Sequence, residues 1–325
     1  MELDLFLIVF NFIFFLYPTA AHPSTVARTL PADLSAPDFP VSIANVTADG
    51  INVFYRYAGD ENGPPFLLLH GVPSSSHQYR NIIPLLAKAG FRVIAPDMPG
   101  FGFTQVPASR NFTYSFANLA TTMLAFIDVL EIEKFAGVYV FDYGAPTAFR
   151  IALQRPDLWA SIVSQNGNAY VAGLGPAWSL VQEYWATGSK AARTACLQVL
   201  SFQSTMEQYT NGSAHPWLIQ PEGYWLDQSL MDRPGNMDIQ LDLYYDYRNN
   251  VAMYPQFQEY FRTSNVPVLA LWGQNDQFFI PAGAEAYAAD VKTFELHWFD
   301  AGHYALDTNE IAMASYIDEF IKSHT

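Results

Sequence analysis

Two carboxylates and a histidine follow short apolar runs at widely separated points of the chain. Asp142 directly follows one such run, and Asp276 and His303 each lie four residues beyond another. A carboxylate is ionised at neutral pH and can displace a leaving group from a saturated carbon, which gives an ester. A histidine held by a second carboxylate can then take a proton from water, so that the water hydrolyses the ester. If folding brings these three side chains together, they predict a hydrolase that works through a covalent ester on Asp142.

The apolar runs that precede these residues predict the strands of a parallel sheet. Each run is short, continuous and bounded by Gly, Pro or Asp, as expected for strands covered on both faces. Helical patterns lie between most of them, and two alternating segments around Asp49-Gly50 predict an N-terminal hairpin. The runs lie at 66–69, 91–95, 135–141, 159–164, 266–272 and 294–299, and the helical patterns at 79–89, 115–130, 145–154, 282–289 and 309–322. This alternation predicts a three-layer α/β fold, in which residues at the carboxyl ends of the strands face the ligand.

The loops after these strands resemble those of the α/β-hydrolase fold. The order nucleophile, acid, histidine agrees with the triad order of that fold. A single Asp after a strand more often caps a helix, but here five loops match together. These loops are His70-Gly71-Val72-Pro73, the segment 96–102 (PDMPGFG), Asp142-Tyr143-Gly144, Gly273-Gln274-Asn275-Asp276 and Asp300-Ala301-Gly302-His303. The resemblance implies a mostly parallel, twisted sheet covered by helices, with a helical cap inserted between two strands.

The nucleophile elbow carries the main departure from the serine enzymes of this fold. The family places its nucleophile on a sharp turn between strand and helix, with Gly close by because the backbone is crowded. Here the residue at that position is Asp142, and no Gly-x-Ser-x-Gly occurs in the chain. Serine esterase chemistry is therefore excluded. The resemblance also implies that the backbone N–H groups of Val72 and Tyr143 form an oxyanion hole.

The interval from Gly167 to Tyr254 has a different character from the rest of the chain. It is rich in Trp and Tyr, has helical stretches and contains no convincing strand. We expect residues 167–254 to form the cap, and residues 22–166 and 255–325 to form the α/β-hydrolase core. Most of the aromatic residues are expected to pack the cap onto the core, and those in a pocket favour a small apolar organic substrate, with water as the second reactant.

Among the enzymes of this fold that use a carboxylate nucleophile, two kinds fit the sequence poorly. Haloalkane dehalogenases hold the departing halide with a Trp directly after the nucleophile and an Asn or Trp elsewhere, often in the His-Gly loop, but the corresponding residues here are Tyr143 and Val72. Fluoroacetate dehalogenases hold the substrate carboxylate with two Arg in the elbow, where this chain has Tyr143 and Pro146. Arg150 lies farther along the predicted helix and is expected to form a surface contact or a salt bridge.

Epoxide hydrolases resemble this chain more closely. They combine a His-Gly-x-Pro loop with an Asp elbow, and cap tyrosines protonate the oxygen of the opening ring. The segment Asp246-Tyr247-Arg248-Asn249 resembles the part of the cap that carries one such tyrosine, so Tyr247 is predicted to be the donor. Tyr184 and Tyr170 are candidates for a second donor, although neither matches the family position. A phenol is needed because an alkoxide is a poor leaving group.

Other functions stay open at this point. Within the same fold the alternative is a haloalkane dehalogenase-like hydrolase. A biosynthetic enzyme could use His303 and Tyr247 for acid and base chemistry without a covalent ester. A receptor could use the pocket to bind a small ligand, with the catalytic groups vestigial, because fold alone does not determine function.

The composition limits the partners and the location of the protein. The net charge of -15 over 325 residues is unsuited to nucleic acid and to anionic membrane surfaces. Residues 1–21 are expected to be a signal peptide, because the apolar run at 5–16 is too short to span a membrane comfortably and Thr19-Ala20-Ala21 suits signal peptidase. An uncleaved N-terminal anchor is the alternative, since the first residues are acidic.

A secreted or secretory-pathway glycoprotein is therefore predicted, with no membrane association after signal cleavage. Asn45, Asn111 and Asn211 each begin an Asn-x-Ser/Thr triplet. The seven histidines show no metal-binding spacing and no Gly-rich phosphate loop is present, so we expect no cofactor and no metal. Cys196 is the sole cysteine and forms no intrachain disulfide. The oligomeric state is not readable from the sequence.

Overall fold

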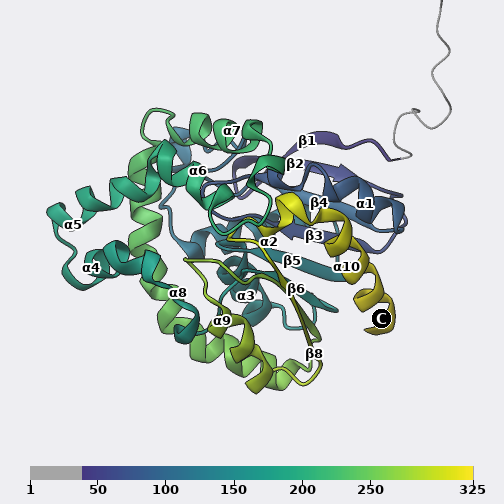
Figure 1. Cartoon of the computed structure of the whole chain (residues 1–325). Helices are drawn as coiled ribbons and strands as arrows, with labels where there is room; N and C mark the ends of the chain where they lie inside the picture. Colours follow the sequence, from purple (N-terminus) through teal and green to yellow (C-terminus); the bar gives the residue numbers. More distant parts are fainter. Residues whose placement is uncertain (1–38, 325) are drawn as a thin grey trace, which may run out of the picture. The chain divides into compact units, whose positions relative to one another are not determined.

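A computed structural model of the chain describes residues 39–324, and the predicted signal peptide at 1–21 lies outside this range. Within it, eight strands form one sheet in the order β1-β2-β4-β3-β5-β6-β7-β8 (Figure 1). Their bounds are β1 Ser42–Ala48, β2 Ile51–Ala58, β3 Pro65–Leu69, β4 Arg92–Pro96, β5 Gly137–Phe141, β6 Ile162–Gln165, β7 Val268–Gly273 and β8 Phe294–Phe299. The six predicted runs thus correspond to β3 through β8, with shifts of a few residues at their ends.

The two N-terminal strands form the predicted hairpin. β1 and β2 pair antiparallel with Ala48 opposite Ile51, so that Asp49 and Gly50 form the turn. Both turn residues have positive φ values, 51° and 71°, which suit the tight turns that follow the twist of a hairpin. β2 also pairs antiparallel with β4, and every later pair in the sheet is parallel.

Helices cover both faces of the sheet, which explains why its central strands are apolar throughout. The helices of the core are α1 Ile82–Lys88, α2 Phe116–Val129, α3 Gly144–Gln154, α9 Pro281–Ala286 and α10 Glu310–His324 (Figure 1). In β3, Leu67 and Leu69 pack in the same cluster as residues of α2 and α3, whereas Phe66 and Leu68 pack with residues of α1 and α10. These three layers confirm the α/β-hydrolase fold class.

A helical segment is inserted between β6 and β7. Its helices are α4 Ser179–Thr187, α5 Lys190–Ala195, α6 Phe202–Thr210, α7 Pro221–Met231 and α8 Asn236–Ser264. The predicted boundary between cap and core at 254/255 falls inside α8, which continues through Pro255 and packs against α3. Arg150 of α3 donates two hydrogen bonds to Asn250 Oδ1, so this helix belongs to both parts.

No helix within residues 39–324 is both long enough and apolar enough to span a bilayer.

Candidate active site

Asp142 occupies a strained turn between β5 and α3. Its φ of 47° lies in the left-handed region, which a residue with a side chain adopts only when its surroundings enforce it. Two glycines allow this turn to pack closely against the β3 loop. A Cβ on Gly144 would lie 2.1 Å from the carbonyl oxygen of Leu69, and a Cβ on Gly71 would lie 2.3 Å from the Asp142 Cβ. The carboxylate is therefore held at the edge of the sheet by backbone contacts.

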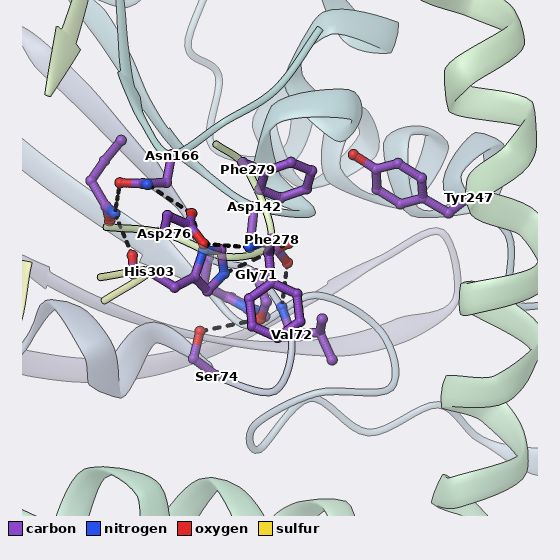
Figure 2. A network of polar contacts seen from close by, with 12 residues as sticks. Gly71, Val72, Ser74, Asp142, Asn166, Tyr247, Asp276, Phe278, Phe279 and His303 are labelled. Atoms are coloured by element: carbon purple, nitrogen blue, oxygen red, sulfur yellow. Dashed lines mark hydrogen bonds and ion pairs between the residues drawn. The ribbon is translucent and has the colours of Figure 1, made fainter. Parts of the chain in front are cut away.

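The structure brings Asp142, Asp276 and His303 together (Figure 2). His303 Nδ1 lies 2.8 Å from Asp276 Oδ2, and its Nε2 faces Asp142 Oδ2 at 3.9 Å. All three side chains are buried. The first contact is a hydrogen bond that fixes the imidazole, whereas the second leaves the Nε2 atom available to a water or a reacting group.

Asp276 has further partners that hold it in place. Its Oδ1 accepts from the Phe278 N–H at 2.7 Å, and its Oδ2 accepts from the Asn166 amide at 2.8 Å. Asn166 Oδ1 in turn accepts from the Gly273 N–H at 2.9 Å. The sequence reasoning missed Asn166, although it directly follows β6, and polar residues after an apolar run were the available signal.

Backbone N–H groups point at the Asp142 carboxylate. The Val72 N–H donates to Oδ1 at 2.7 Å, and the Tyr143 N–H also hydrogen bonds to the carboxylate. The β3 loop that carries Val72 is braced by His70, whose Nδ1 lies 2.9 Å from the Gly71 carbonyl and whose Nε2 accepts from the Met98 N–H at 3.0 Å. These two N–H groups are suitably placed to stabilise negative charge at Asp142.

Burial raises the pKa of Asp142 to about 6, although nearby His303 and the two N–H groups act in the opposite direction. Burial alone would lower the pKa of His303. The charge and hydrogen bond of Asp276, together with the charge of Asp142, outweigh that effect and raise the pKa of His303 above its ordinary value. Asp142 is therefore mainly ionised at pH 7 and above, which is the form that nucleophilic attack by a carboxylate would require.

The predicted cap tyrosines lie in different surroundings. Tyr247 is fully buried with its ring 4.5 Å from that of Trp178, and its hydroxyl lies 3.3 Å from the Tyr254 hydroxyl. Figure 2 shows Tyr247 on the α8 side of the site, with no hydrogen bond to the triad. The Tyr184 hydroxyl accepts from Arg193 at 3.1 Å. Neither hydroxyl is thus bonded to Asp142 or His303.

Tyr170, the other candidate donor, packs its ring against Tyr287 at 5.0 Å. Tyr287 belongs to the segment after α9. The structure does not place Tyr170 in the lining of the pocket at Asp142.

A small pocket of about 10 Å³ lies directly on the triad, enough for about one water molecule. Its lining includes Asp142, His303 and two polar cap residues that the sequence reasoning missed, Tyr244 and Gln208. Tyr244 lies in α8, three residues before Tyr247. The rest of the lining is apolar and consists of Val72, Ala177, Trp178, Val181, Val199 and Phe278.

Among residues 39–324, no three His, Cys, Asp or Glu side chains are grouped so that they could hold a metal ion. Cys196 is buried and free.

Comparisons with known proteins agree with this architecture. A family model described as alpha/beta hydrolase fold matches residues 64–310. A protein of Saccharomyces cerevisiae named as an uncharacterized hydrolase is 45% identical over 277 residues, which cover 83% of this chain and 93% of that protein. A haloalkane dehalogenase of Psychrobacter cryohalolentis is 37% identical over 116 residues, which cover 36% of this chain and 38% of the enzyme. A solved structure of the epoxide hydrolase CorEH superposes with a TM-score of 0.69 at 21% identity, covering 87% of this chain and 98% of CorEH.

The burial of Asp142 generates a prediction that needs no substrate. A carboxyl whose pKa rises on folding from 3.8 to about 6 destabilises the folded protein when ionised, by about 3 kcal/mol at full effect. The protonated form of Asp142 avoids this destabilisation. The resulting contribution to folding stability is fully present below about pH 4 and is lost as the pH rises through 6. Asp142→Asn should therefore raise the free energy of unfolding, measured with urea, at pH 8, and the gain should disappear near pH 4.

Glu61→Gln serves as the control for that comparison, because Glu61 is an exposed carboxylate in the loop after β2. It should show no such gain at either pH. If Asp142→Asn were no more stable than the wild type at pH 8, the cost assigned to the buried carboxylate would be wrong.

Proposed function

This chain belongs to the alpha/beta hydrolase fold family and is a hydrolase, and from that premise we propose that it hydrolyses small epoxides through a covalent ester on Asp142. The observation that carries the proposal is that one enclosed pocket is lined by Asp142, His303 and the Tyr244 phenol. These are the three groups that the reaction needs: a carboxylate nucleophile, a base for water and a proton donor for the ring oxygen.

The first step is attack by an Asp142 oxygen on a ring carbon. The C–O bond of the epoxide breaks, its electron pair goes to the ring oxygen, and this oxygen takes a proton from the Tyr244 hydroxyl. The products are an ester on Asp142 and a phenolate. Tyr244 is preferred to Tyr247 as the donor because it lines the pocket, whereas the Tyr247 hydroxyl is bonded to Tyr254.

The second step is hydrolysis of the ester. His303 Nε2 takes a proton from water, and the resulting hydroxide attacks the ester carbonyl of Asp142. The Val72 and Tyr143 N–H groups stabilise the tetrahedral oxyanion. When the intermediate collapses, the imidazolium protonates the departing alkoxide, and the proton left on Asp142 returns to the Tyr244 phenolate through solvent. The sum is one epoxide plus one water giving one diol.

Esterification removes the negative charge of Asp142, which is one of the influences that raise the pKa of His303. The pKa of His303 is therefore lower in the ester than in the free enzyme. This change favours the neutral imidazole in the step where it must accept a proton.

Haloalkane hydrolysis is the second candidate, because part of the chain is similar to a haloalkane dehalogenase. The residues at the family's halide-holding positions argue against it. Val72 contributes an apolar side chain to the pocket, and Tyr143 is buried among Phe101, Phe116 and Tyr247.

We further propose that the protein passes through the secretory pathway and is glycosylated there. The three acceptor residues Asn45, Asn111 and Asn211 are all exposed, so the side chain of each is accessible to glycan attachment. The protein secreted by a eukaryotic host should lose mass on treatment with an N-glycosidase, and an unchanged mass would contradict the proposal.

His303→Gln tests the covalent step directly. Without the base, the ester should form and persist, so incubation with styrene-type or aliphatic epoxides should raise the intact protein mass by one epoxide. Peptide mapping should place the adduct on Asp142, and an Asp142→Asn/His303→Gln double variant should gain no mass. Adducts with haloalkanes alone would favour the second candidate. No adduct with any compound would favour acid and base chemistry without a covalent ester.

The donor assignment is tested by comparing two tyrosines on the same helix. Tyr244→Phe removes the phenol that lines the pocket and should lower kcat/KM for epoxides by about 100-fold. Tyr247→Phe removes one buried hydrogen bond and should mainly reduce stability, by about 1 kcal/mol. If Tyr247→Phe caused the larger loss of kcat/KM at unchanged structure, Tyr247 would be the donor, as the sequence resemblance predicted.

A further inference from the structure

A second cavity adjoins the pocket at Asp142. It has a volume of about 250 Å³ and shares Gln208, Phe278 and His303, among other residues, with that pocket. Its remaining lining comes from α6 and from the loop after β7. The full lining is Ala177, Val199, Ser204, Glu207, Gln208, Asn211, Gln277, Phe278 and His303. A substituent of a substrate bound at Asp142 can therefore extend into this cavity.

The chemistry of the cavity differs from that of the aromatic pocket. Four of its lining side chains are neutral hydrogen-bonding groups, namely those of Ser204, Gln208, Asn211 and Gln277, and it includes one carboxylate, Glu207. It has no Lys or Arg, and its one histidine, His303, is already paired with Asp142 and Asp276, so an anionic substituent would meet the like charge of Glu207 and no free counter-ion. Glu207, Asn211 and Gln277 are exposed and form its outer part, whereas Gln208 and His303 are buried at its inner end.

Among the residues of this lining, Gln208 says most about the chemistry of the group that the cavity would bind. Its side chain is only 6% exposed, yet its carboxamide has no hydrogen bond to any residue within 39–324. Two other buried glutamines of the same insertion form hydrogen bonds through their carboxamides. Gln228 binds Thr205, Leu200 and Asp232, and Gln240 donates to the Gly100 carbonyl. Buried amides are almost always hydrogen-bonded, so the Gln208 amide requires a partner inside the cavity.

We infer that this cavity selects the substrate, and that Gln208 hydrogen bonds to a neutral polar substituent carried near the epoxide ring. The inference rests on the proposed function and specifies its substrate class: epoxides with a hydroxyl or carbonyl group a few bonds from the ring, rather than purely hydrocarbon epoxides or epoxy acids. It narrows the apolar substrate that the aromatic composition of the cap predicts. Gln208 supplies both a donor and an acceptor, which suits a hydroxyl group.

Three epoxides of equal carbon number test the inference. These are 4,5-epoxypentan-1-ol, 1,2-epoxypentane and 4,5-epoxypentanoate. The wild type should hydrolyse the alcohol with a kcat/KM about 3- to 10-fold above that of the hydrocarbon, the range expected from one hydrogen bond, and the acid should be the poorest substrate. Gln208→Leu should bring the ratio of alcohol to hydrocarbon close to one.

Gln198→Leu is the matched control, because Gln198 is an exposed glutamine of the same insertion that does not line the cavity. It should keep the wild-type ratio. Equal kcat/KM values for alcohol and hydrocarbon in the wild type, or an unchanged ratio in Gln208→Leu, would overturn the inference.

Binding of the unreactive diol products separates this inference from the proposed function. Titration followed by tryptophan fluorescence, to which the pocket residue Trp178 contributes, should give a lower Kd for pentane-1,2,5-triol than for pentane-1,2-diol in the wild type but not in Gln208→Leu. If that preference is present and no epoxide is consumed, the assignment of the cavity as a binding site for a polar substituent stands, and the proposed epoxide hydrolysis is wrong. Equal or undetectable binding of both products would overturn the cavity assignment, whatever the enzyme does with epoxides.

Discussion

The arrangement of the site follows from one constraint, which is that a carboxylate is buried at the end of β5 with no Lys or Arg beside it. His303 is the only ion-pairing partner of Asp142 among residues 39–324, and it faces that carboxylate at 3.9 Å. The missing cation is replaced by backbone N–H groups, which remain in place when the charge moves. Holding these N–H groups against the carboxylate requires the β3 loop and the elbow to approach within a distance that only Gly71 and Gly144 permit.

The cap adds to this constraint by limiting the space for water beside the Asp142 carboxylate. Trp178 and Tyr244 lie over the carboxylate, and the pocket between them and the triad holds about one water molecule. In such surroundings a charge interacts strongly with the few polar groups that remain, so their placement determines the chemistry. The raised pKa of Asp142 is a direct effect of this enclosure.

The sequence predicted those parts of the site that depend on a single element. An apolar run followed by a polar residue defines a strand end without any knowledge of what packs on it, so Asp142, Asp276 and His303 could be identified and their meeting anticipated. Asn166 could have been found in the same way, because it follows β6 directly. Its role depends on the short distance between the ends of β6 and β7, which the order of strands in the sheet determines.

The cap residues could not be identified in this way. Helical periodicity shows that Tyr244 and Tyr247 lie on the same side of a helix, but the rotation of α8 relative to the sheet decides which of them faces Asp142. That rotation is fixed by distant contacts such as Arg150 with Asn250, which have no local signature. Gln208 on α6 could not be identified for the same reason, because the packing of the cap decides which face of α6 lines the cavity. The continuation of α8 past the predicted cap boundary likewise depends on its distant contact with α3.

The two carboxylates around His303, Asp142 and Asp276, differ in the hydrogen bonds that their oxygens accept. Both oxygens of Asp276 accept hydrogen bonds, from the Phe278 N–H on one side and from Asn166 and His303 on the other. Asp142 accepts only from backbone groups: Oδ1 accepts from the Val72 N–H, and the Tyr143 N–H also donates to the carboxylate. No side chain within residues 39–324 donates a hydrogen bond to Oδ2, and Asp142 and His303 line the same pocket. An oxygen already bound by donors is a poor nucleophile, because its lone pairs are engaged. The hydrogen-bond pattern by itself therefore favours Asp142 as the attacking group and Asp276 as the residue that orients the imidazole.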